Sequence, residues 1–367
     1  MRAAILGVVL VAVALPAQAE KTVSVPTKAT QSNKAAPATT GSTTSPDAEK
    51  SIGVAPVLDS AGTLGVPPPA AGLMPSADDL IRSGRALTDE GEGDIAFGAF
   101  QRGLYLTAFQ IAMSRAQRGD GASATLVGRL YGEGLGVKQS DQAAAAWYQQ
   151  GALGGDPNAQ LALGLLYLDG RGVKKDRTKA ADAFEQAAEW NEPQALYNLG
   201  LLYLEGTVRP RDAEKAASLF SKSAGQGNVD AQFALAQLYA EGEGVVLDDG
   251  IATMWMAKAA KAGHPDAAVE YGIRLFNGIG AGKDIIAAAG WFQRAAESGN
   301  AVGQNRYARI LASGMGADPD PVAAAKWHLI AEKRGAKDEW LDDFVERLPE
   351  GQRKAAEIAA ERWPAGH

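Results

Sequence analysis

The chain has 367 residues, a net charge of −7, 43 glycines, three histidines and no cysteine. Lack of cysteine excludes disulfides, thiolate nucleophiles and thiolate metal sites, and three histidines leave little material for an imidazole cluster. The acidic balance argues against a general affinity for nucleic acid.

The N-terminus predicts export. Met1-Arg2 precede the apolar run AAILGVVLVAVALPA, and the small-x-small motif Ala17-Gln18-Ala19 follows. These are the parts of a secretory signal peptide over residues 1–19, and the run is shorter than the roughly 20 residues that span a bilayer. We expect cleavage before Glu20, a periplasmic or secreted protein, and no membrane span after cleavage. An uncleaved anchor is the alternative.

Residues 20–77 are rich in Thr, Ser, Ala and Pro and show no lasting apolar periodicity. The first aromatic residue of the whole chain is Phe97. A segment with so little material for a core is predicted to be a disordered linker.

From there on, the chain repeats itself every 36 residues. Glycines at this spacing are Gly134, Gly170, Gly206, Gly242, Gly278 and Gly314. A second column holds Gly128, Gly164, Gly200, Ala236, Gly272 and Ala308, and a third holds Tyr131, Tyr167, Tyr203, Tyr239, Leu275 and Leu311. A fourth, with steps of 37, 36, 35, 36 and 36, holds Trp147, Phe184, Phe220, Trp255, Trp291 and Trp327. Such a period indicates a solenoid of stacked units.

Each unit is predicted to contain two helices. In ALYNLGLLYLEG, Leu199 and Tyr203 are four residues apart, as on one helix face, and Gly200 lets a neighbouring helix approach. Gly170 and Gly172 permit the positive φ that ends a helix and reverses the chain. An alanine-rich helix around Phe184 follows. The predicted fold is all-α, an α/α solenoid of helix-loop-helix repeats.

These units resemble the Sel-one-like repeat family, a relative of the tetratricopeptide repeat. The unit at 159–194 carries the family pattern at Ala159, Leu163, Gly164, Tyr167, Gly170, Gly172, Val173, Lys179, Ala180, Phe184, Ala187 and Ala188. The resemblance assigns six repeats to 123–336, preceded by a degenerate repeat or cap at 78–122. Residues 337–367 are then a C-terminal helical cap. The unit at 195–230 has GTVRPRD in its loop, so we expect a differently shaped loop there.

The sequence shows no catalytic set. The phosphate-binding loop with its lysine, H-E-x-x-H, G-x-S-x-G and S-x-x-K are all missing. His264 is interpreted as a polar turn residue, and His328 as a packed or solvated helix residue. We therefore predict no enzyme activity, no cofactor and no metal.

An acidic column precedes the first loop glycine of four units: Glu133, Asp169, Glu205 and Glu241. Successive units would hold these carboxylates roughly 10 Å apart, which is too far for one ion. We interpret the column as a solvated edge.

The stronger functional signal is an apolar stripe. The resemblance implies that first helices line a concave face, and the positions beside the core there are largely apolar. They are Leu161, Leu165, Leu168, Tyr197, Leu201, Leu204, Phe233, Gln237, Ala240, Val269, Ile273 and Phe276. An exposed contiguous apolar surface usually marks a binding site, so we predict a groove for a protein or peptide partner. Alternatively, these residues pack against adjacent helices or are covered by the linker.

The sequence therefore predicts an exported scaffold or regulatory adaptor of the cell envelope. The competing prediction is a cell-wall-associated protein that binds peptidoglycan or β-lactam-like ligands. Relatives described as penicillin-binding rely on paired cysteines, which this chain lacks.

Overall fold

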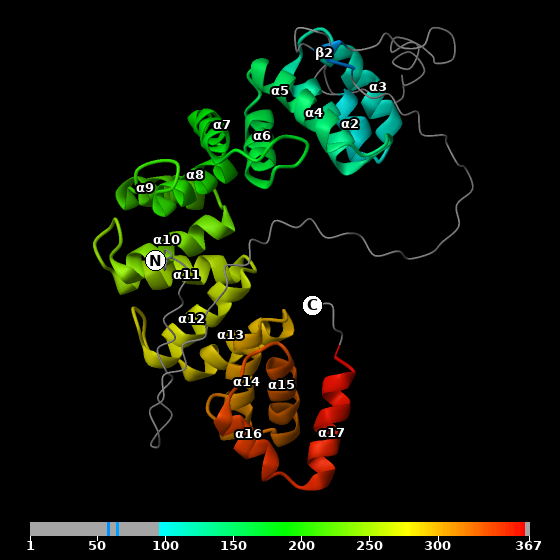
Figure 1. Cartoon of the computed structure of the whole chain (residues 1–367). Helices are drawn as coiled ribbons and strands as arrows, with labels where there is room; N and C mark the ends of the chain where they lie inside the picture. The colour runs from blue at the N-terminus through cyan, green and yellow to red at the C-terminus, as the bar shows by residue number, and fades with distance from the viewer. Residues whose placement is uncertain (1–56, 59–63, 66–94, 364–367) are drawn as a thin grey trace, which may run out of the picture. The chain divides into compact units, whose positions relative to one another are not determined.

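A computed structural model of the chain describes residues 57–58, 64–65 and 95–363. Within these residues the protein is helical apart from two short strands, β1 (Val57–Leu58) and β2 (Leu64–Gly65), which pair antiparallel (Figure 1). The predicted signal peptide, the linker apart from these strands, and residues 78–94 lie outside the described part.

Sixteen helices follow in the described residues. The first two are α2 (Ile95–Gln101) and α3 (Tyr105–Ala116). Six pairs come next: α4 (Gly121–Glu133) and α5 (Asp141–Leu153), α6 (Pro157–Asp169) and α7 (Arg177–Glu189), α8 (Pro193–Glu205) and α9 (Ala213–Gly225), α10 (Val229–Glu241) and α11 (Asp249–Lys261), α12 (Pro265–Asn277) and α13 (Ile285–Glu297), α14 (Ala301–Ser313) and α15 (Pro321–Lys333). The last two are α16 (Glu339–Glu346) and α17 (Glu350–Glu361). The all-α prediction with its 36-residue helix pairs is confirmed.

The described helices fall into two compact units. The N-terminal unit comprises residues 95–202 and 207–209, and the C-terminal unit comprises 203–206 and 210–363. The boundary runs through α8 and the loop after it. No helix in the described part of the chain is long and apolar enough to cross a membrane.

Local chemistry fixes where each first helix ends and where the second helix of the pair begins. At the C-terminal end of α6, Gly170 adopts a left-handed conformation with φ of 74° and donates to the Leu166 carbonyl at 2.8 Å. After the loop, the Asp176 backbone N–H donates to the Tyr167 carbonyl, and the Asp176 side chain caps α7. Side chains cap the second helices of all six pairs at one column: Ser140, Asp176, Asp212, Asp248, Asp284 and Asp320. Each such cap contributes about 1 kcal/mol.

The second glycine of the loop fixes how repeats stack. Gly172 has φ of 67° and lies against the Asp141 carbonyl, where the second helix of the preceding repeat begins. A side chain at Gly172 would collide with that backbone. The same contact recurs from Gly244 to Ala213, from Gly280 to Asp249 and from Gly316 to Ile285.

The loop at Gly206–Asp212 is built differently, as its sequence predicted. Val208 occupies the place of the second glycine and has no positive φ. The next residue, Arg209, reaches α7 and pairs with Asp182 at 2.6 Å and with Glu185 at 3.0 Å. An ion-pair cluster therefore joins this loop to the preceding repeat where the other loops use glycine.

The crossing of the two helices within a repeat depends on a small residue opposite a ring. A Cβ at Gly272 would lie 2.7 Å from the buried Phe292 ring, and one at Gly128 would lie 2.8 Å from the Tyr148 ring. At strict 36-residue spacing this ring column is Tyr148, Phe184, Phe220, Met256, Phe292 and His328. The aromatic column predicted from the sequence combined Phe184 and Phe220 of this column with residues of the column one position earlier, which contains Trp147, Trp255, Trp291 and Trp327. This mixture of two columns explains why its spacing varied between 35 and 37 residues.

The last two helices pack beside α15. Leu341 of α16 and Ala360 of α17 belong to one core cluster with Trp327. The Asp338 side chain accepts from the Leu341 backbone N–H at the start of α16, and Arg309 of α14 holds that carboxylate through two bonds of 2.6 and 2.7 Å. Those hydrogen bonds and the charge of Arg309 hold the pKa of Asp338 below its usual value, against the opposing effect of burial.

The repeat containing α12 and α13 offers a matched pair of glycine substitutions. We expect Gly272→Ala to lower the free energy of unfolding by about 1–3 kcal/mol, because the new methyl group collides with Phe292. Gly290→Ala, on an exposed helix position with no heavy atom within 4 Å, should raise it by about 0.5–1 kcal/mol. Urea denaturation measures both. Equal effects of the two substitutions would contradict the crossing model.

Candidate functional site

The apolar stripe has its half-buried part in the N-terminal unit. Leu161, Leu165 and Leu168 of α6 are all half-buried, and so are Tyr197 and Leu201 of α8. Since α6 also buries Leu163 and Leu166 in the core, it carries apolar side chains on nearly every side. These five residues present apolar surface on the first helices of two consecutive repeats.

The stripe does not continue as exposed surface in the C-terminal unit. Of the predicted groove residues there, Gln237 and Ala240 are half-buried, whereas the others are buried: Leu204, Phe233, Val269, Ile273 and Phe276. Four of these, all except Leu204, belong to one core cluster. The expectation of accessible surface is corrected for the five buried residues, because they pack against neighbouring helices.

Two charged residues occupy half-buried positions of α12 and α14. Glu270 and Arg306 are 36 residues apart, at the same position of two consecutive first helices. No ion pair joins them within the described contacts, and each has a buried polar atom without a hydrogen-bond partner, Oε1 in Glu270 and Nε in Arg306. Neither residue was among those predicted from the sequence. Their signal is opposite charge in a column that carries alanine at Ala162 and Ala234.

Burial controls the ionisation of this pair. It raises the pKa of Glu270 to about 7, an effect that Arg274 and Arg306 oppose and Asp266 assists. It also lowers the pKa of Arg306. Arg274 itself donates to Asp249 and Thr253 at 3.1 Å each, so its charge is already engaged.

The other singled-out residues have local roles. His264 caps α12 by accepting from the Ala267 backbone N–H, and its ring stacks on Phe233 with centroids 4.3 Å apart. Burial lowers the pKa of His264. The turn interpretation of His264 therefore gains a specific cap. The acidic column lies at the last residues of four first helices, and all four members are exposed: Glu133, Asp169, Glu205 and Glu241.

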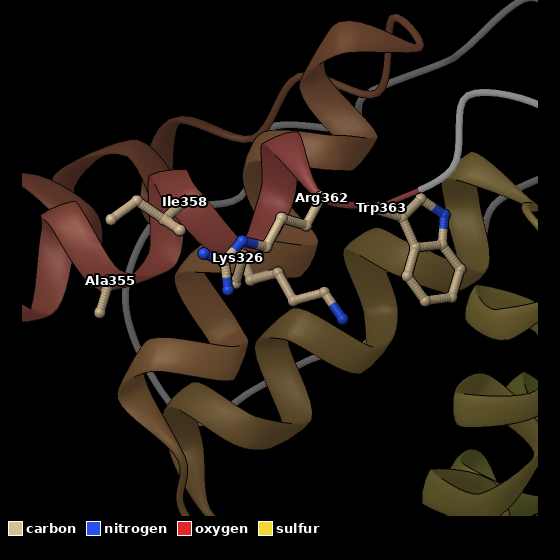
Figure 2. Close-up of a pocket in the computed structure, with 6 residues that line it drawn as sticks. Lys326, Ala355, Ile358, Arg362 and Trp363 are labelled. Atoms are coloured by element: carbon tan, nitrogen blue, oxygen red, sulfur yellow. The ribbon is translucent and has the colours of Figure 1, made fainter.

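An open depression lies between α15 and α17 (Figure 2). Lys326 and Arg362 line it together with Ile358 and Trp363. The Lys326 ammonium lies 4.2 Å from the centre of the Trp327 ring and 4.6 Å from that of Trp363, and burial lowers its pKa. Two cations beside apolar side chains suit an anionic group, but the depression holds no nucleophile paired with a base.

Comparisons with known proteins support the repeat assignment. A family model described as Sel1 repeat matches residues 121–156, 157–189, 193–228, 229–264, 265–300 and 301–335. A search of curated proteins gave no match.

Two solved structures are similar in fold. One is a protective antigen present in uropathogenic Escherichia coli strains that displays an SLR fold, with 26% identity and a TM-score of 0.65. The match covers 78% of this chain and 64% of the antigen, so this chain spans less than two thirds of that protein. The other is a Sel1 repeat protein from Oxalobacter formigenes, with 26% identity, a TM-score of 0.59, and coverage of 66% of this chain and 97% of that one.

The raised pKa of Glu270 predicts a pH-dependent contribution to stability. The folded protein holds this proton more tightly than the unfolded chain, whose carboxyl has a pKa near 4.5. The stabilising contribution is therefore complete below the unfolded pKa and is lost as the pH rises through about 7.

The amide of Glu270→Gln stays neutral at every pH. We therefore expect the free energy of unfolding of this variant, relative to that of the wild type, to increase by on the order of 2 kcal/mol when the pH is raised from about 5 to about 8.5. Urea denaturation at the two pH values measures the difference. Glu357→Gln, at an exposed position of α17, is the control and should show no such trend. A wild-type pH dependence that persists in Glu270→Gln would refute the assignment.

Proposed function

Because the chain belongs to the Sel1 repeat family, whose solenoids generally act as protein–protein interaction scaffolds, we propose that it is an exported scaffold or regulatory adaptor of the cell envelope. Its partner is a polypeptide that binds on the first helices. The half-buried apolar stripe of α6 and α8 carries the proposal, because five large apolar side chains remain partly accessible there.

The chemistry of this surface defines the kind of partner. Leu161, Leu165 and Leu168 follow one face of α6, and Tyr197 and Leu201 follow the equivalent face of α8. Such a surface suits an extended or helical segment with apolar side chains at regular intervals. The described residues carry no nucleophile–base pair beside it, so binding without chemistry is the simpler proposal.

Export rests on the sequence of residues 1–19. An apolar core between Arg2 and the Ala17-Gln18-Ala19 motif supports cleavage before Glu20 and a partner in the envelope.

Site-specific photo-crosslinking tests the partner surface. We expect a crosslinker at Leu165 to capture a defined polypeptide in intact cells, whereas one at the exposed Gln186 of α7 should not.

With that polypeptide purified, Leu161→Gln combined with Leu165→Gln should weaken its binding by about 10–100-fold, since two apolar contacts are lost. Calorimetry measures the affinity, and circular dichroism checks the fold. Equal capture from both positions, or unchanged affinity of the double variant, would exclude this surface.

Export has a separate test. We expect Leu10→Arg to leave the chain uncleaved and inside the cell, because a charge interrupts the apolar core. Intact-mass measurement of the fractionated wild type should show a chain that begins at Glu20. A wild-type chain that keeps Met1 in the cytoplasmic fraction would reject export while leaving the scaffold proposal standing.

A further inference from the structure

The last repeat departs from the others at two columns of its second helix. His328 occupies the ring column that elsewhere holds Tyr148, Phe184, Phe220, Met256 and Phe292. Glu332 occupies a column that is otherwise entirely alanine: Ala152, Ala188, Ala224, Ala260 and Ala296. The two departures are four residues apart, so they place an imidazole and a carboxylate on the same face of α15.

The cap supplies a third group. Asp342 of α16 faces His328, with its Oδ1 atom 2.6 Å from His328 Nε2. One ligand atom from each of His328, Glu332 and Asp342 lies within 4.8 Å of the other two. A helical pair four residues apart and a carboxylate from a facing helix form a geometry that can chelate one ion.

Burial leaves His328 with one usable nitrogen. The His328 side chain is 2% exposed, and its Nδ1 atom is buried without a hydrogen-bond partner in the described structure. Nε2 is thus the atom available to a ligand. Glu332 is exposed and Asp342 is half-exposed, so an ion can reach the cluster from solvent.

We propose that His328, Glu332 and Asp342 bind a borderline divalent metal ion of the zinc type, which fastens α16 to α15. One imidazole and two carboxylates suit such an ion, whereas Mg²⁺ and Ca²⁺ prefer oxygen ligands alone. The two carboxylates balance the charge of the ion. A fourth position remains for water.

Binding requires one small movement. Two ligand atoms of a tetrahedral zinc ion are roughly 3.3 Å apart, which is more than the present 2.6 Å between His328 Nε2 and Asp342 Oδ1. Asp342 can provide it, because its side chain is half-exposed. The α16 backbone remains fixed by the Asp338 cap and its bonds to Arg309.

Titration calorimetry of the full chain with Zn²⁺ tests the site. We expect one site per chain, with binding at least about tenfold weaker in Glu332→Gln and Asp342→Asn and undetectable in His328→Gln. At a Zn²⁺ concentration near the wild-type dissociation constant, Zn²⁺ should raise the melting temperature of the wild type more than that of Glu332→Gln, and Mg²⁺ or Ca²⁺ should have no effect. Glu357→Gln should behave as the wild type.

The variants separate a metal site from a simple hydrogen-bonded pair of His328 and Asp342. Glu332 is exposed, so its substitution should leave the fold and the His328–Asp342 bond intact; the proposal survives even where His328→Gln fails to fold. No Zn²⁺ binding by the wild type would show that His328 and Asp342 form only a hydrogen-bonded pair. Zn²⁺ binding of equal strength in Glu332→Gln and Asp342→Asn would place the ion elsewhere. Either result overturns the proposal.

Discussion

The spacing of the repeats depends on one close approach of backbone to backbone. The second glycine of a loop lies against the first turn of the second helix in the preceding repeat, as Gly172 does against Asp141 and Gly280 against Asp249. Only glycine combines the positive φ with the missing side chain that this contact needs. Gly136 makes the equivalent contact with Tyr105 and Leu106, so α3 stands where a second helix would stand. The solenoid pattern thus extends before the six matched repeats.

Where this contact is missing, a different interaction takes its place. Arg209 follows the position that glycine vacates and binds Asp182 and Glu185 of α7. A glycine contact is short and rigid, whereas an ion-pair cluster of partly exposed side chains depends on solvent and salt. The boundary between the two compact units falls at the same loop. The one repeat that lacks the backbone contact is therefore also the place where the chain divides.

Much of the fold can be predicted from the sequence, because the residues that end, cap and cross the helices recur at the same position in several repeats. The left-handed glycines, the helix pairs and the altered loop at Val208 were all predictable from spacing and from what glycine alone can do. The stripe was harder to predict. Position on a helix cannot separate a solvated face from one that meets a neighbour, and so Leu165 is half-buried whereas Phe233 and Ile273 are core. Burial of this kind is decided by the side chains of adjacent helices, which no single helix encodes.

The columns also show how one scaffold comes to offer different chemistry along its length. The repeats share their loop glycines, their helix caps and a small residue at the helix crossing, whereas other columns vary from one repeat to the next. Leucine at such positions gives the apolar stripe of α6, a charged pair gives Glu270 and Arg306, and departures at His328 and Glu332 bring ligand atoms to the cap. The residues worth testing are therefore those that differ from their own column. Residues that recur in a column explain why the protein folds, and residues that differ from their column indicate where it can bind a ligand or partner.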